Sequence, residues 1–384
     1  MHKPKFFITT TIPLTWIFFK GQPRLWKNDF DVCAISSDGK EFDPFVKDEG
    51  IKKHIIPMKR KISILHDIWS LILFIFFFLN ERPMIVHGNT PKAAMLSMVA
   101  AWLTRRPIRI YMCHGLRYQG AQGKLRNLLM AMEKLSCKCA TNVLCVSDSV
   151  KEQFIADGIC PQKKVKVVGY GTAGGIDTEH YKRGQLDTNR NVRNELGISE
   201  DAFVFCFVGR VVADKGINEL VEATEQLLEK HNNVHLLLIG PEEKKLNPIS
   251  SKSRETIYAN AHIHALGWQD DMRPYVAASD AFVLPSYREG VGMVILEANA
   301  LDVPAIATDI IGCRDVIVPN VNGVLVKPRD TDSLYSAMKE WVEHPEVVKE
   351  MSRRCRQIVL DRYSHESVRD AYYKEYKRLA GFSN

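Results

Sequence analysis

The sequence predicts an α/β protein made of two doubly wound, Rossmann-like domains that face each other across a cleft. The chain has 384 residues, which is too long for one ordinary hydrophobic core and suits two domains of roughly 150–200 residues each. Short apolar runs alternate with helix-length segments from end to end. Because these runs are continuously apolar, they indicate parallel strands that helices cover on both faces.

The first set of predicted strands fills the N-terminal half of the chain. Helical stretches separate most of them, for example 91–104 and 122–140. Such regular alternation of strand and helix is typical of a doubly wound sheet. The predicted strands are 5–10 (KFFITT), 31–36 (DVCAIS), 54–58 (HIIPM), 84–88 (MIVHG), 108–113 (IRIYMC), 142–147 (NVLCVS) and 164–169 (KVKVVG).

A second set of predicted strands follows a polar stretch that indicates a linker. We expect an N-terminal domain at 1–182, a linker at 183–200, a C-terminal domain at 201–365, and a helix at 366–384 that packs back on the N-terminal domain. The strands of the second set are 203–209 (FVFCFVG), 234–240 (VHLLLIG), 263–267 (IHALG), 281–286 (AFVLPS), 304–308 (PAIAT) and 323–327 (GVLVK).

Composition and charge narrow the class of protein. Hydrophobic residues make up 46% and charged residues 25% of the chain, as in ordinary soluble enzymes, which excludes disorder and collagen-like repeats. Residues 1–190 hold 29 Lys and Arg against 16 Asp and Glu, a net charge of +13, whereas 191–384 hold 23 against 29, a net charge of −6. The first half therefore suits an anionic surface. Membrane phospholipid, nucleic acid and phosphorylated substrates all qualify, and we rank membrane first.

The most apolar segment is IWSLILFIFFFL at 68–79. Twelve helical residues span only about 18 Å, short of the roughly 30 Å hydrocarbon core of a bilayer. The favoured interpretation is a helix packed between the sheet and its neighbours, and the alternative is a helix that partly enters the membrane interface. The adjacent basic triplet at 59–61 would suit anionic head groups in that second case.

The cysteines and the N-terminus point to a reducing compartment. Of nine cysteines, Cys137 and Cys139 are one residue apart, and no second pair or histidine cluster completes a metal site. We expect them to be reduced, as in a cytoplasmic protein. The N-terminus leads directly into a strand without a small-residue cleavage site, so no secretory signal is predicted.

The strongest motif is SYREGVGMVILEANA at 286–300, which follows an apolar strand and opens a helix. Gly290, Val291 and Gly292 lie at the predicted helix N-terminus, where free N–H groups and the helix dipole favour a diphosphate. Glu289 and Glu297 could accept hydrogen bonds from sugar hydroxyls. The alternative is that Glu289 caps the helix and Glu297 is a solvated surface residue.

A second motif, FVFCFVGRVVADKGINEL at 203–220, ends a strand at Gly209 and continues into a helix. Arg210 and Lys215 frame the loop between them, and two cations at this edge of a sheet could hold a diphosphate leaving group. An ordinary exposed loop that carries two charges is the alternative.

Histidines lie at the carboxyl ends of two predicted strands of the first domain. His114 comes after 108–113, and its position suits hydrogen bonding to a sugar or to developing charge. His87 and Asn89 lie at another strand end, a reasonable acceptor-side position. For His114 a satisfied, buried histidine is the alternative.

Two further patterns do not support a cofactor. GYGTAG at 169–174 matches the dinucleotide fingerprint, but the sequence after it continues as loop, whereas the fingerprint needs a helix to open there. The D-x-D pairs at 29–31 and 330–332 have no further acidic residues beside them, and the second is typical of a helix N-cap. We therefore expect neither NAD nor a metal site.

Taken together, these segments resemble glycosyltransferase family 4, retaining enzymes of the GT-B fold, over nearly the whole chain. The core of the resemblance is E-G-x-G-x-x-x-x-E from Glu289 to Glu297, with Arg210 and Lys215 at the expected distance before it. The segments LTWIFFKGQ, VHGNTPKA and HGLRYQG look like those of bacterial capsule and O-antigen transferases. Those enzymes act on polyprenyl-diphosphate-linked glycans at the cytoplasmic face of the inner membrane.

The resemblance implies a role for each motif residue. Arg210 and Lys215 would neutralise the diphosphate, Glu289 would hold the donor sugar, Glu297 the ribose hydroxyls, and His114 would contact the sugar near the reacting carbon. Gly209, Gly290, Val291 and Gly292 would complete the donor site.

The acceptor side departs from the family pattern. Many members have a Gly-Gly loop after the first strand, whereas this chain has Thr-Thr-Thr-Ile-Pro at 9–13 and a glycine only at Gly21. The implied acceptor-side residues are Gly21, His87 and Asn89.

The expected activity is retaining, metal-independent hexosyl transfer without a cofactor. The resemblance implies a UDP-sugar donor and a polyprenyl-diphosphate-linked glycan acceptor, and UDP-N-acetylhexosamine is the favoured donor. The implied further partner is an anionic membrane surface, not nucleic acid. The enzyme would be cytoplasmic and peripheral on the inner face of the membrane. The alternatives are a UDP-sugar 2-epimerase of related architecture and a non-catalytic scaffold in a polysaccharide assembly complex.

Overall fold

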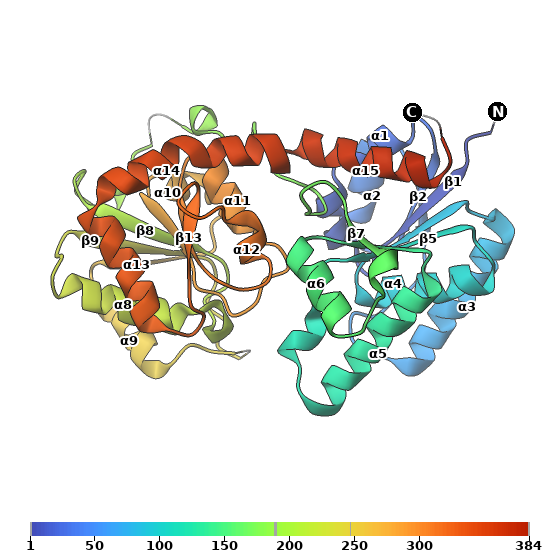
Figure 1. Cartoon of the computed structure of the whole chain (residues 1–384), viewed down its shortest axis with the longest axis horizontal. Helices are drawn as coiled ribbons and strands as arrows, with labels where there is room; N and C mark the ends of the chain where they lie inside the picture. Colours follow the sequence, from blue (N-terminus) through green and yellow to red (C-terminus); the bar gives the residue numbers. More distant parts are fainter. Residues whose placement is uncertain (1, 188–189, 246, 383–384) are drawn as a thin grey trace. The chain divides into compact units, whose positions relative to one another are not determined.

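The computed structural model describes residues 2–187, 190–245 and 247–382, which form two compact units (Figure 1). The first unit comprises Met1–Gly175 and His365–Asn384, and the second comprises Ile176–Ser364. The chain thus enters the second unit once and returns to the first for its last helix. Residues 183–200, where the sequence suggests a linker, belong to the second unit.

The first unit is a seven-stranded parallel sheet in the order β3-β2-β1-β4-β5-β6-β7. The edge strand β3 covers Lys52–Ile55 and so begins two residues before the predicted run 54–58, because the exposed lysines at its start hide the strand from a hydropathy reading. The other strands are β1 (Lys5–Thr9), β2 (Asp31–Ser36), β4 (Ile85–Gly88), β5 (Ile108–Cys113), β6 (Asn142–Cys145) and β7 (Val165–Val167).

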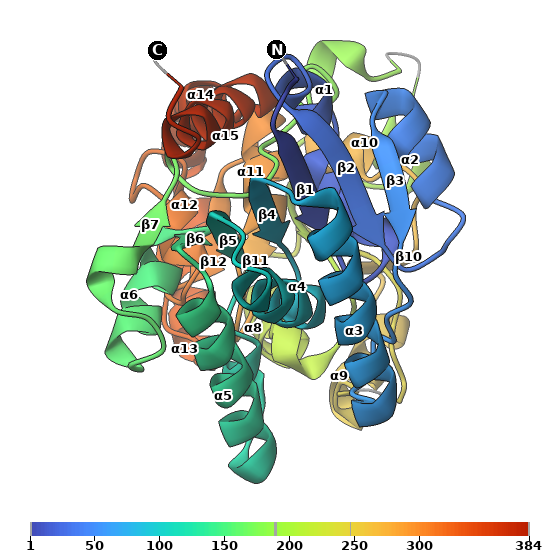
Figure 2. The ribbon, with the colours of Figure 1, turned by 90° about the vertical axis from the view of Figure 1, so that its right-hand side faces the viewer.

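Helices cover both faces of this sheet, and α3 and α5 each pack against α4 (Figure 2). An aromatic cluster around Phe6, with Trp26 and Phe30, fills the core on the side of β1. The helices are α1 (Gln22–Trp26), α2 (Phe42–Glu49), α3 (Ile64–Glu81), α4 (Pro91–Leu103), α5 (Gly123–Cys139) and α6 (Asp148–Ala156), with 3-10 helices η1 (Pro13–Phe19), η2 (Arg117–Gly120) and η3 (Gln162–Lys164).

The last helix, α15 (His365–Leu379), packs on the first unit through Val368, Tyr372 and Tyr376. The Tyr376 ring lies 5.1 Å from the ring of Phe6 in the core, and the Tyr372 hydroxyl donates to the carbonyl of Thr172 at 2.8 Å. Buried aromatic side chains therefore hold the C-terminus of the chain on the unit that contains its N-terminus.

The second unit is a six-stranded parallel sheet in the order β10-β9-β8-β11-β12-β13. Its four central strands, β8, β9, β11 and β12, are mostly buried, as continuously apolar runs predict, whereas the edge strands β10 and β13 are only partly buried. The strands are β8 (Phe203–Val208), β9 (Val234–Ile239), β10 (Ile263–Gly267), β11 (Ala281–Leu284), β12 (Ala305–Thr308) and β13 (Gly323–Val326).

The helices of the second unit connect these strands and then lead to α15. The predicted N-cap at Asp330 is confirmed, since its carboxylate accepts from the N–H of Ser333 at 2.8 Å. The helices are α7 (Val192–Glu195), α8 (Ile217–Leu228), α9 (Ser251–Ala259), α10 (Arg273–Ala277), α11 (Met293–Ala300), α12 (Cys313–Val316), α13 (Thr331–Glu343) and α14 (Pro345–Ile358), with η4 (Arg183–Gln185), η5 (Ala213–Lys215) and the π-helix η6 (Val359–Tyr363).

Each sheet has a topological switch point beside its first strand. β1 lies between β2 and β4, and β8 lies between β9 and β11, so the chain winds outward in opposite directions from these strands. Ligands of such sheets bind in the crevice outside the carboxyl ends of the strands at a switch point. The motifs of the sequence follow β4, β5, β8 and β11.

Helix α3 differs from the favoured sequence interpretation. It runs over 18 residues, longer than the predicted 68–79, and only Ser70, Phe74 and Phe78 are buried. By length and composition it could cross a membrane, and only 17% of its residues are buried. The expectation of a helix packed between the sheet and its neighbours is therefore wrong for most of its surface.

Candidate functional site

The loop after β8 is shaped by glycines. Gly209 has φ +150°, and Gly216, which precedes α8, is left-handed with φ +72°. A Cβ at Gly216 would lie 2.1 Å from the carbonyl oxygen of Pro285, directly after β11. Only glycine therefore allows the loop after β8 to approach the loop after β11 this closely. Lys215, the last residue of η5, directly precedes Gly216 in this loop.

The loop after β11 carries the strongest motif and leads into α11. Gly292 is the N-cap of α11, and Gly312 lies behind the loop with φ +88°, where a Cβ would be 2.9 Å from the carbonyl group of Gly290. In the part of the chain that the structure describes, the N–H groups of Gly290 and Val291 form no hydrogen bond. These two donors and the positive end of the helix dipole make the start of α11 suitable for an anion.

The structure brings Lys215 and Glu289 together. The Lys215 Nζ lies 2.5 Å from Glu289 Oε1, and both side chains are mostly buried. Backbone contact supports the pair, because the N–H of Tyr287 donates to the carbonyl of Asp214 at 2.9 Å. An ion pair between Arg288 and Asp214 at 3.1 Å also joins the two loops. The predicted cation and the predicted carboxylate thus meet at the switch point of the second sheet.

Arg210 lies in the same loop as Lys215 but has another partner. Its guanidinium forms an ion pair with Glu243 at 3.0 Å, and both side chains are partly exposed. Because an exposed pair of this kind contributes little free energy, an incoming anion could displace Glu243 at low cost. Glu243 was not predicted, because it lies in the loop after β9 at no recognisable spacing from the motifs.

Glu297 lies within α11, two turns after Glu289. Burial raises the pKa of the Glu297 carboxyl to about 7, and a hydrogen bond with Tyr181 opposes this rise. Glu297 is therefore not the solvated helix residue of the alternative interpretation. Tyr181 was not predicted, since it lies more than 100 residues earlier in a polar segment.

In the first unit, His114, Asn89 and His87 form a hydrogen-bonded series. His114 Nε2 lies 3.0 Å from Asn89 Oδ1, and Asn89 Nδ2 lies 3.4 Å from His87 Nδ1. Because an amide oxygen can only accept, Nε2 of His114 carries the hydrogen and Nδ1 is left as an acceptor in the neutral ring. Burial lowers the pKa of His114 to about 4, and burial together with His114 lowers that of His87 to about 3.

The three side chains differ in exposure. His87 and Asn89 are fully buried, whereas His114 is partly exposed. The side chains of these two predicted acceptor-side residues are therefore closed off from solvent, and His114, which contacts Asn89, is the member of the series that reaches the surface.

The segment after β1 is apolar where the family pattern has glycines. It forms η1, and Leu14, Ile17 and Phe18 are exposed there. The Phe18 ring lies 6.1 Å from the His114 ring, so η1 and the histidine share one surface. Gly21 follows with φ +78°, and its N–H donates to Glu49 at 2.6 Å, which gives this predicted acceptor-side residue a local structural contact.

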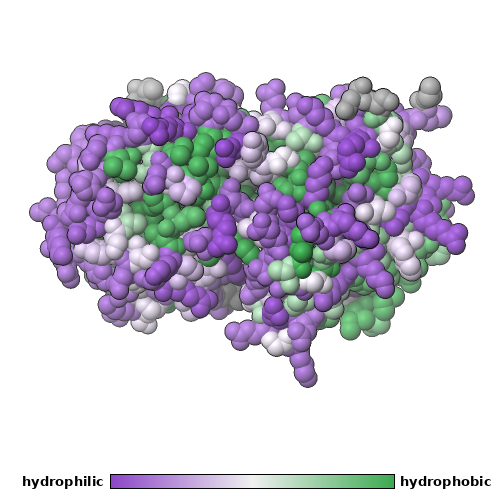
Figure 3. Space-filling view, in the orientation of Figure 1, coloured by the Kyte–Doolittle hydropathy of each residue, from purple (hydrophilic) through white to green (hydrophobic). Residues whose placement is uncertain are grey.

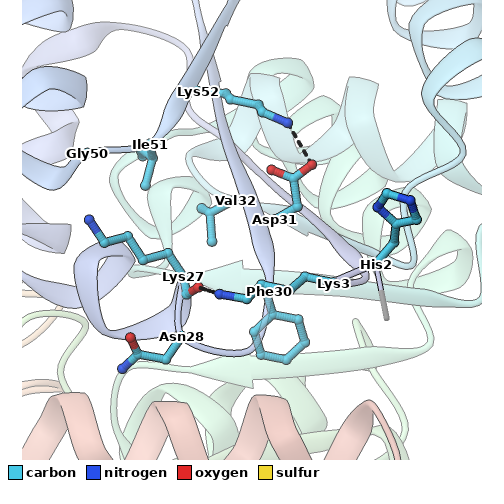
Figure 4. A pocket seen from close by; sticks show the side chains of 10 residues that line it. All are labelled: His2, Lys3, Lys27, Asn28, Phe30, Asp31, Val32, Gly50, Ile51 and Lys52. Atoms are coloured by element: carbon cyan, nitrogen blue, oxygen red, sulfur yellow. Dashed lines mark hydrogen bonds and ion pairs between the residues drawn. The ribbon is translucent and has the colours of Figure 1, made fainter.

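A cavity of about 690 Å³ lies elsewhere on the first unit, at the amino ends of β1 and β2. Figure 4 shows Lys52 directed to Asp31, and Lys3 directed to the carbonyl of Lys27, within it. Ligands of doubly wound sheets bind at the opposite, carboxyl edge. The cavity is therefore separate from the predicted site, and none of the predicted residues lines it.

The described residues contain no group of three or more His, Cys, Asp or Glu side chains that could hold a metal ion. Of the two D-x-D pairs, Asp31 forms an ion pair with Lys52 at 2.7 Å and Asp330 caps α13. GYGTAG follows β7 and continues as turns, without a helix, to Ile176. Its Gly171 instead allows close contact with the carbonyl of Val146.

Two family models match the chain. The model described as "Glycosyltransferase Family 4" matches residues 23–179, and that described as "Glycosyl transferases group 1" matches residues 188–358. Together they cover most of both units.

Curated relatives and solved structures match over nearly the full length. The chain is 33% identical to the capsular polysaccharide biosynthesis glycosyltransferase CapM of Staphylococcus aureus, over 96% of this chain and 95% of CapM. It is 26% identical to the UDP-Gal:alpha-D-GlcNAc-diphosphoundecaprenol alpha-1,3-galactosyltransferase of Escherichia coli, over 89% of each chain. The crystal structure of Anabaena HepE in complex with UDP has a TM-score of 0.80 at 18% identity and covers 98% of this chain and 100% of HepE, a similarity of fold.

Proposed function

The chain belongs to glycosyltransferase family 4, with the bacterial polysaccharide glycosyltransferases, and from this premise we propose a specific reaction for it. It transfers a sugar from a UDP-sugar to a polyprenyl-diphosphate-linked glycan, and it retains the anomeric configuration. The favoured sugar is N-acetylhexosamine. The E. coli relative supports the substrate classes, because its name specifies a UDP-sugar donor and a diphosphoundecaprenol-linked acceptor.

The contact between Lys215 and Glu289 carries the proposal. It lies at the switch point of the second sheet, next to the N–H groups of Gly290 and Val291. When the bond between sugar and phosphate breaks, negative charge grows on the diphosphate. A fixed ammonium group and fixed N–H donors stabilise that charge without reorganisation. In this proposal they supply the stabilisation, and no metal ion is required.

The remaining residues of the second unit complete the donor site. Arg210 leaves Glu243 and grips the diphosphate with two donors, as guanidinium groups do with phosphates. Gly209 and Gly292 allow the backbone to approach the nucleotide. Glu289 accepts from hydroxyls of the donor sugar, and Glu297 accepts from those of the ribose.

The first unit supplies the acceptor side. Neutral His114 contacts the donor sugar near the reacting carbon, and the buried Asn89 and His87 act as positioning residues that fix its ring. The exposed apolar side chains of η1 suit an acceptor that carries a polyprenyl chain. Because η1 lies beside His114, we infer that it serves as an apolar acceptor loop in place of the Gly-Gly loop of many relatives.

A lipid-linked acceptor requires that the enzyme reach a membrane. We therefore place it in the cytoplasm, bound peripherally to the inner face of the cell membrane. The excess of Lys and Arg in residues 1–190 supports this location, because anionic lipids attract basic surfaces.

A screen of nucleotide sugars followed by a turnover assay tests the proposal. A donor at 100 times its Kd should raise the free energy of unfolding by about 2.7 kcal/mol, which a thermal shift detects. The donor found is then incubated with membrane extract that contains lipid-linked glycan, and we expect UDP release with an α-linked product, without added divalent cation.

Two outcomes would replace the proposal. Conversion of the UDP-sugar in the absence of any acceptor indicates a 2-epimerase. A protein that releases no UDP with any acceptor, and whose thermal shift is unchanged in Glu289→Gln, is a non-catalytic scaffold.

A further inference from the structure

Helix α3 of the first unit presents an apolar face to solvent. Leu65 is 85% and Trp69 54% exposed, although such side chains are normally buried. Figure 3 shows hydrophobic residues gathered over α3 at the lower right of the view. The exposed apolar residues of this helix, here called the α3 face, are Ile64, Leu65, Ile68, Trp69, Ile72, Phe76 and Leu79.

The α3 face is continuous. At 100° per residue its seven members fall within an arc about 140° wide. The polar residues of the helix, such as Asp67, Ser70 and Glu81, lie outside that arc. Soluble monomers rarely expose an apolar patch of this extent unless it binds a partner or a membrane.

The opposite side of α3 is fixed to the unit. Phe77 stacks on Phe7 with ring centroids 5.1 Å apart, and Phe74 and Phe78 are fully buried. A largely buried ion pair between Asp67 and Lys92 of α4, 2.7 Å long, holds the first turn. The helix therefore cannot be surrounded by lipid without loss of these contacts. It can lie along a membrane, but it does not need to span one.

Cations flank the α3 face at both ends. Lys59, Arg60 and Lys61 precede the helix and are exposed, and Arg82, which ends it, is exposed as well. Within the described ranges none of these four side chains forms an ion pair with another residue. An apolar face between basic ends matches the order of a membrane surface, in which anionic head groups adjoin the acyl region.

The same charges argue against a second copy of the chain as the occupant. A two-fold contact through α3 would be isologous, so each α3 face would meet its own copy. With basic residues at both ends of the helix, either parallel or antiparallel pairing would bring cations together. A lipid surface, in contrast, supplies the opposite charge.

A second helix repeats the combination. Helix α5 packs against α4, as α3 does, and projects beside it (Figure 2). Leu125, Leu128 and Leu135 are exposed on it, within an arc of about 80°. Lys124 and Lys134 are exposed on the same helix. Two helices of one layer thus carry exposed apolar side chains, with cations flanking α3 and lying on α5.

We propose that α3 lies in the boundary between the head groups and acyl chains of an anionic leaflet, with the α3 face turned into the lipid and Lys59, Arg60 and Lys61 on the head groups. The inference deepens the proposed function and rests on it for its purpose, since it names the surface by which the enzyme reaches a lipid-linked acceptor. Binding to lipid itself can be measured without any substrate.

Vesicle flotation tests the apolar contact. Full-length protein should float with vesicles of 30% phosphatidylglycerol in phosphatidylcholine, and the double variant Leu65→Glu/Trp69→Glu should bind at least about tenfold more weakly, because charges enter the interface at a high cost. The matched control is Trp268→Glu on the second unit, where Trp268 is 73% exposed, and it should bind as the parent does. Failure of the parent to float, or an equal loss in the control, overturns the proposal.

The basic residues are tested separately. The triple variant Lys59→Gln/Arg60→Gln/Lys61→Gln should lose roughly 100-fold in affinity for the same vesicles, at about fivefold per cation. The control is Lys244→Gln/Lys245→Gln, exposed lysines of the second unit, which should lose little. An equal loss of vesicle affinity in the triple variant and in the control would indicate that net charge alone governs binding, without a docking surface at α3.

Depth and self-association distinguish insertion from pairing. Brominated lipid should quench tryptophan fluorescence in the parent and in Trp268→Phe, and much less in Trp69→Phe. Sedimentation equilibrium without lipid should give a monomer. A dimer that Leu65→Glu/Trp69→Glu abolishes, together with unchanged quenching in Trp69→Phe, would assign the α3 face to a second copy and refute the proposal.

Turnover with a detergent-dispersed acceptor separates this inference from the proposed function. Leu65→Glu/Trp69→Glu should release UDP at the parental rate in detergent and slowly from acceptor in vesicles. If the parent binds vesicles but never releases UDP, the proposed function fails and the docking surface stands. If UDP is released in detergent but vesicles are not bound, only the docking surface fails.

Discussion

At the switch point of the second unit, Lys215 and Glu289 form a close ion pair, and Arg210 pairs with Glu243 nearby. At the switch point of the first unit, His114 and His87 are held neutral by burial and are joined through the amide of Asn89. Two sheets of the same construction thus present charged groups in one case and uncharged donors and acceptors in the other. Fold alone does not determine the chemistry at a switch point.

The difference matches what each side of the proposed reaction requires. A departing diphosphate gains charge, and only fixed opposite charge or N–H donors can stabilise it strongly. A sugar hydroxyl is neutral, and an additional cation beside the acceptor would compete for the diphosphate. The comparison therefore predicts that changes in the second unit alter catalysis through charge, whereas changes in the first unit alter it through orientation and protonation.

Loss of the ammonium group at the second switch point should have the largest effect. Lys215→Ala should lower kcat/KM by about 10²–10³-fold, because an electrostatic contact of the transition state is removed. The measurement is UDP release at limiting donor, with circular dichroism to verify folding. Lys230→Ala, an exposed lysine of the same unit, is the matched control and should retain parental turnover. Near-normal turnover of Lys215→Ala would remove the charge-based description of this site.

The geometry that joins the two charged loops is the next point to break. Gly216→Ala should lower the free energy of unfolding by roughly 3 kcal/mol, because the residue is left-handed and its Cβ would meet the carbonyl of Pro285. Gly197 is also left-handed, with φ +68°, but its Cβ would meet nothing within 4 Å. Gly197→Ala should therefore cost only about 1 kcal/mol. Urea denaturation measures both, and equal losses would show that the close approach of the loops contributes nothing.

Much of this charged site could be predicted from the sequence. Gly209, Lys215 and Glu289 follow continuous apolar runs, and parallel strands place their carboxyl ends at one edge of the sheet. That Lys215 and Glu289 meet also depends on the pairing of β8 with β11, which a single sequence does not reveal. Glu243, Tyr181 and Gly312 could not be found in this way, since each enters from a distant segment and has no spacing relative to the motif.

The first unit shows the same limit, and α3 adds another. His114 and Asn89 were each predicted at a strand end, but their hydrogen bond depends on the pairing of β4 with β5, which a single sequence does not reveal. For α3, hydropathy identified the apolar segment correctly. It could not distinguish a buried from an exposed face, because that distinction depends on whether a neighbouring element covers the helix.

The lowered pKa values of His87 and His114 should make the stability of the first unit depend on pH. Burial lowers the pKa of His87 to about 3, so the unfolded chain, with an ordinary value near 6.5, takes up the proton first. The stabilisation is present above pH 6.5 and is lost as the pH falls toward 3. Between pH 7 and pH 5 the loss is about 2 kcal/mol for His87. Urea denaturation at both pH values should show a smaller loss in His87→Phe than in the parent, and an equal loss in the two proteins would show that His87 does not contribute.

The smallest expected effect concerns Glu297 of α11, which the proposed function places in the donor site of the second unit. Burial raises the pKa of this carboxyl to about 7, although a hydrogen bond with Tyr181 lowers it. The carboxylate therefore gains a proton as the pH falls below 7, and its capacity to accept from ribose hydroxyls declines, by at most about tenfold in affinity per pH unit. Calorimetric titration with UDP from pH 8 to pH 6 measures this decline in affinity.

Because the diphosphate also titrates in mild acid, Glu297→Gln is titrated at each pH as the control, and only the difference in affinity between the two proteins counts. In Tyr181→Phe the opposing hydrogen bond is lost, so the decline should begin at a higher pH. Parallel curves for parent and Glu297→Gln would show that this carboxyl does not contact the nucleotide.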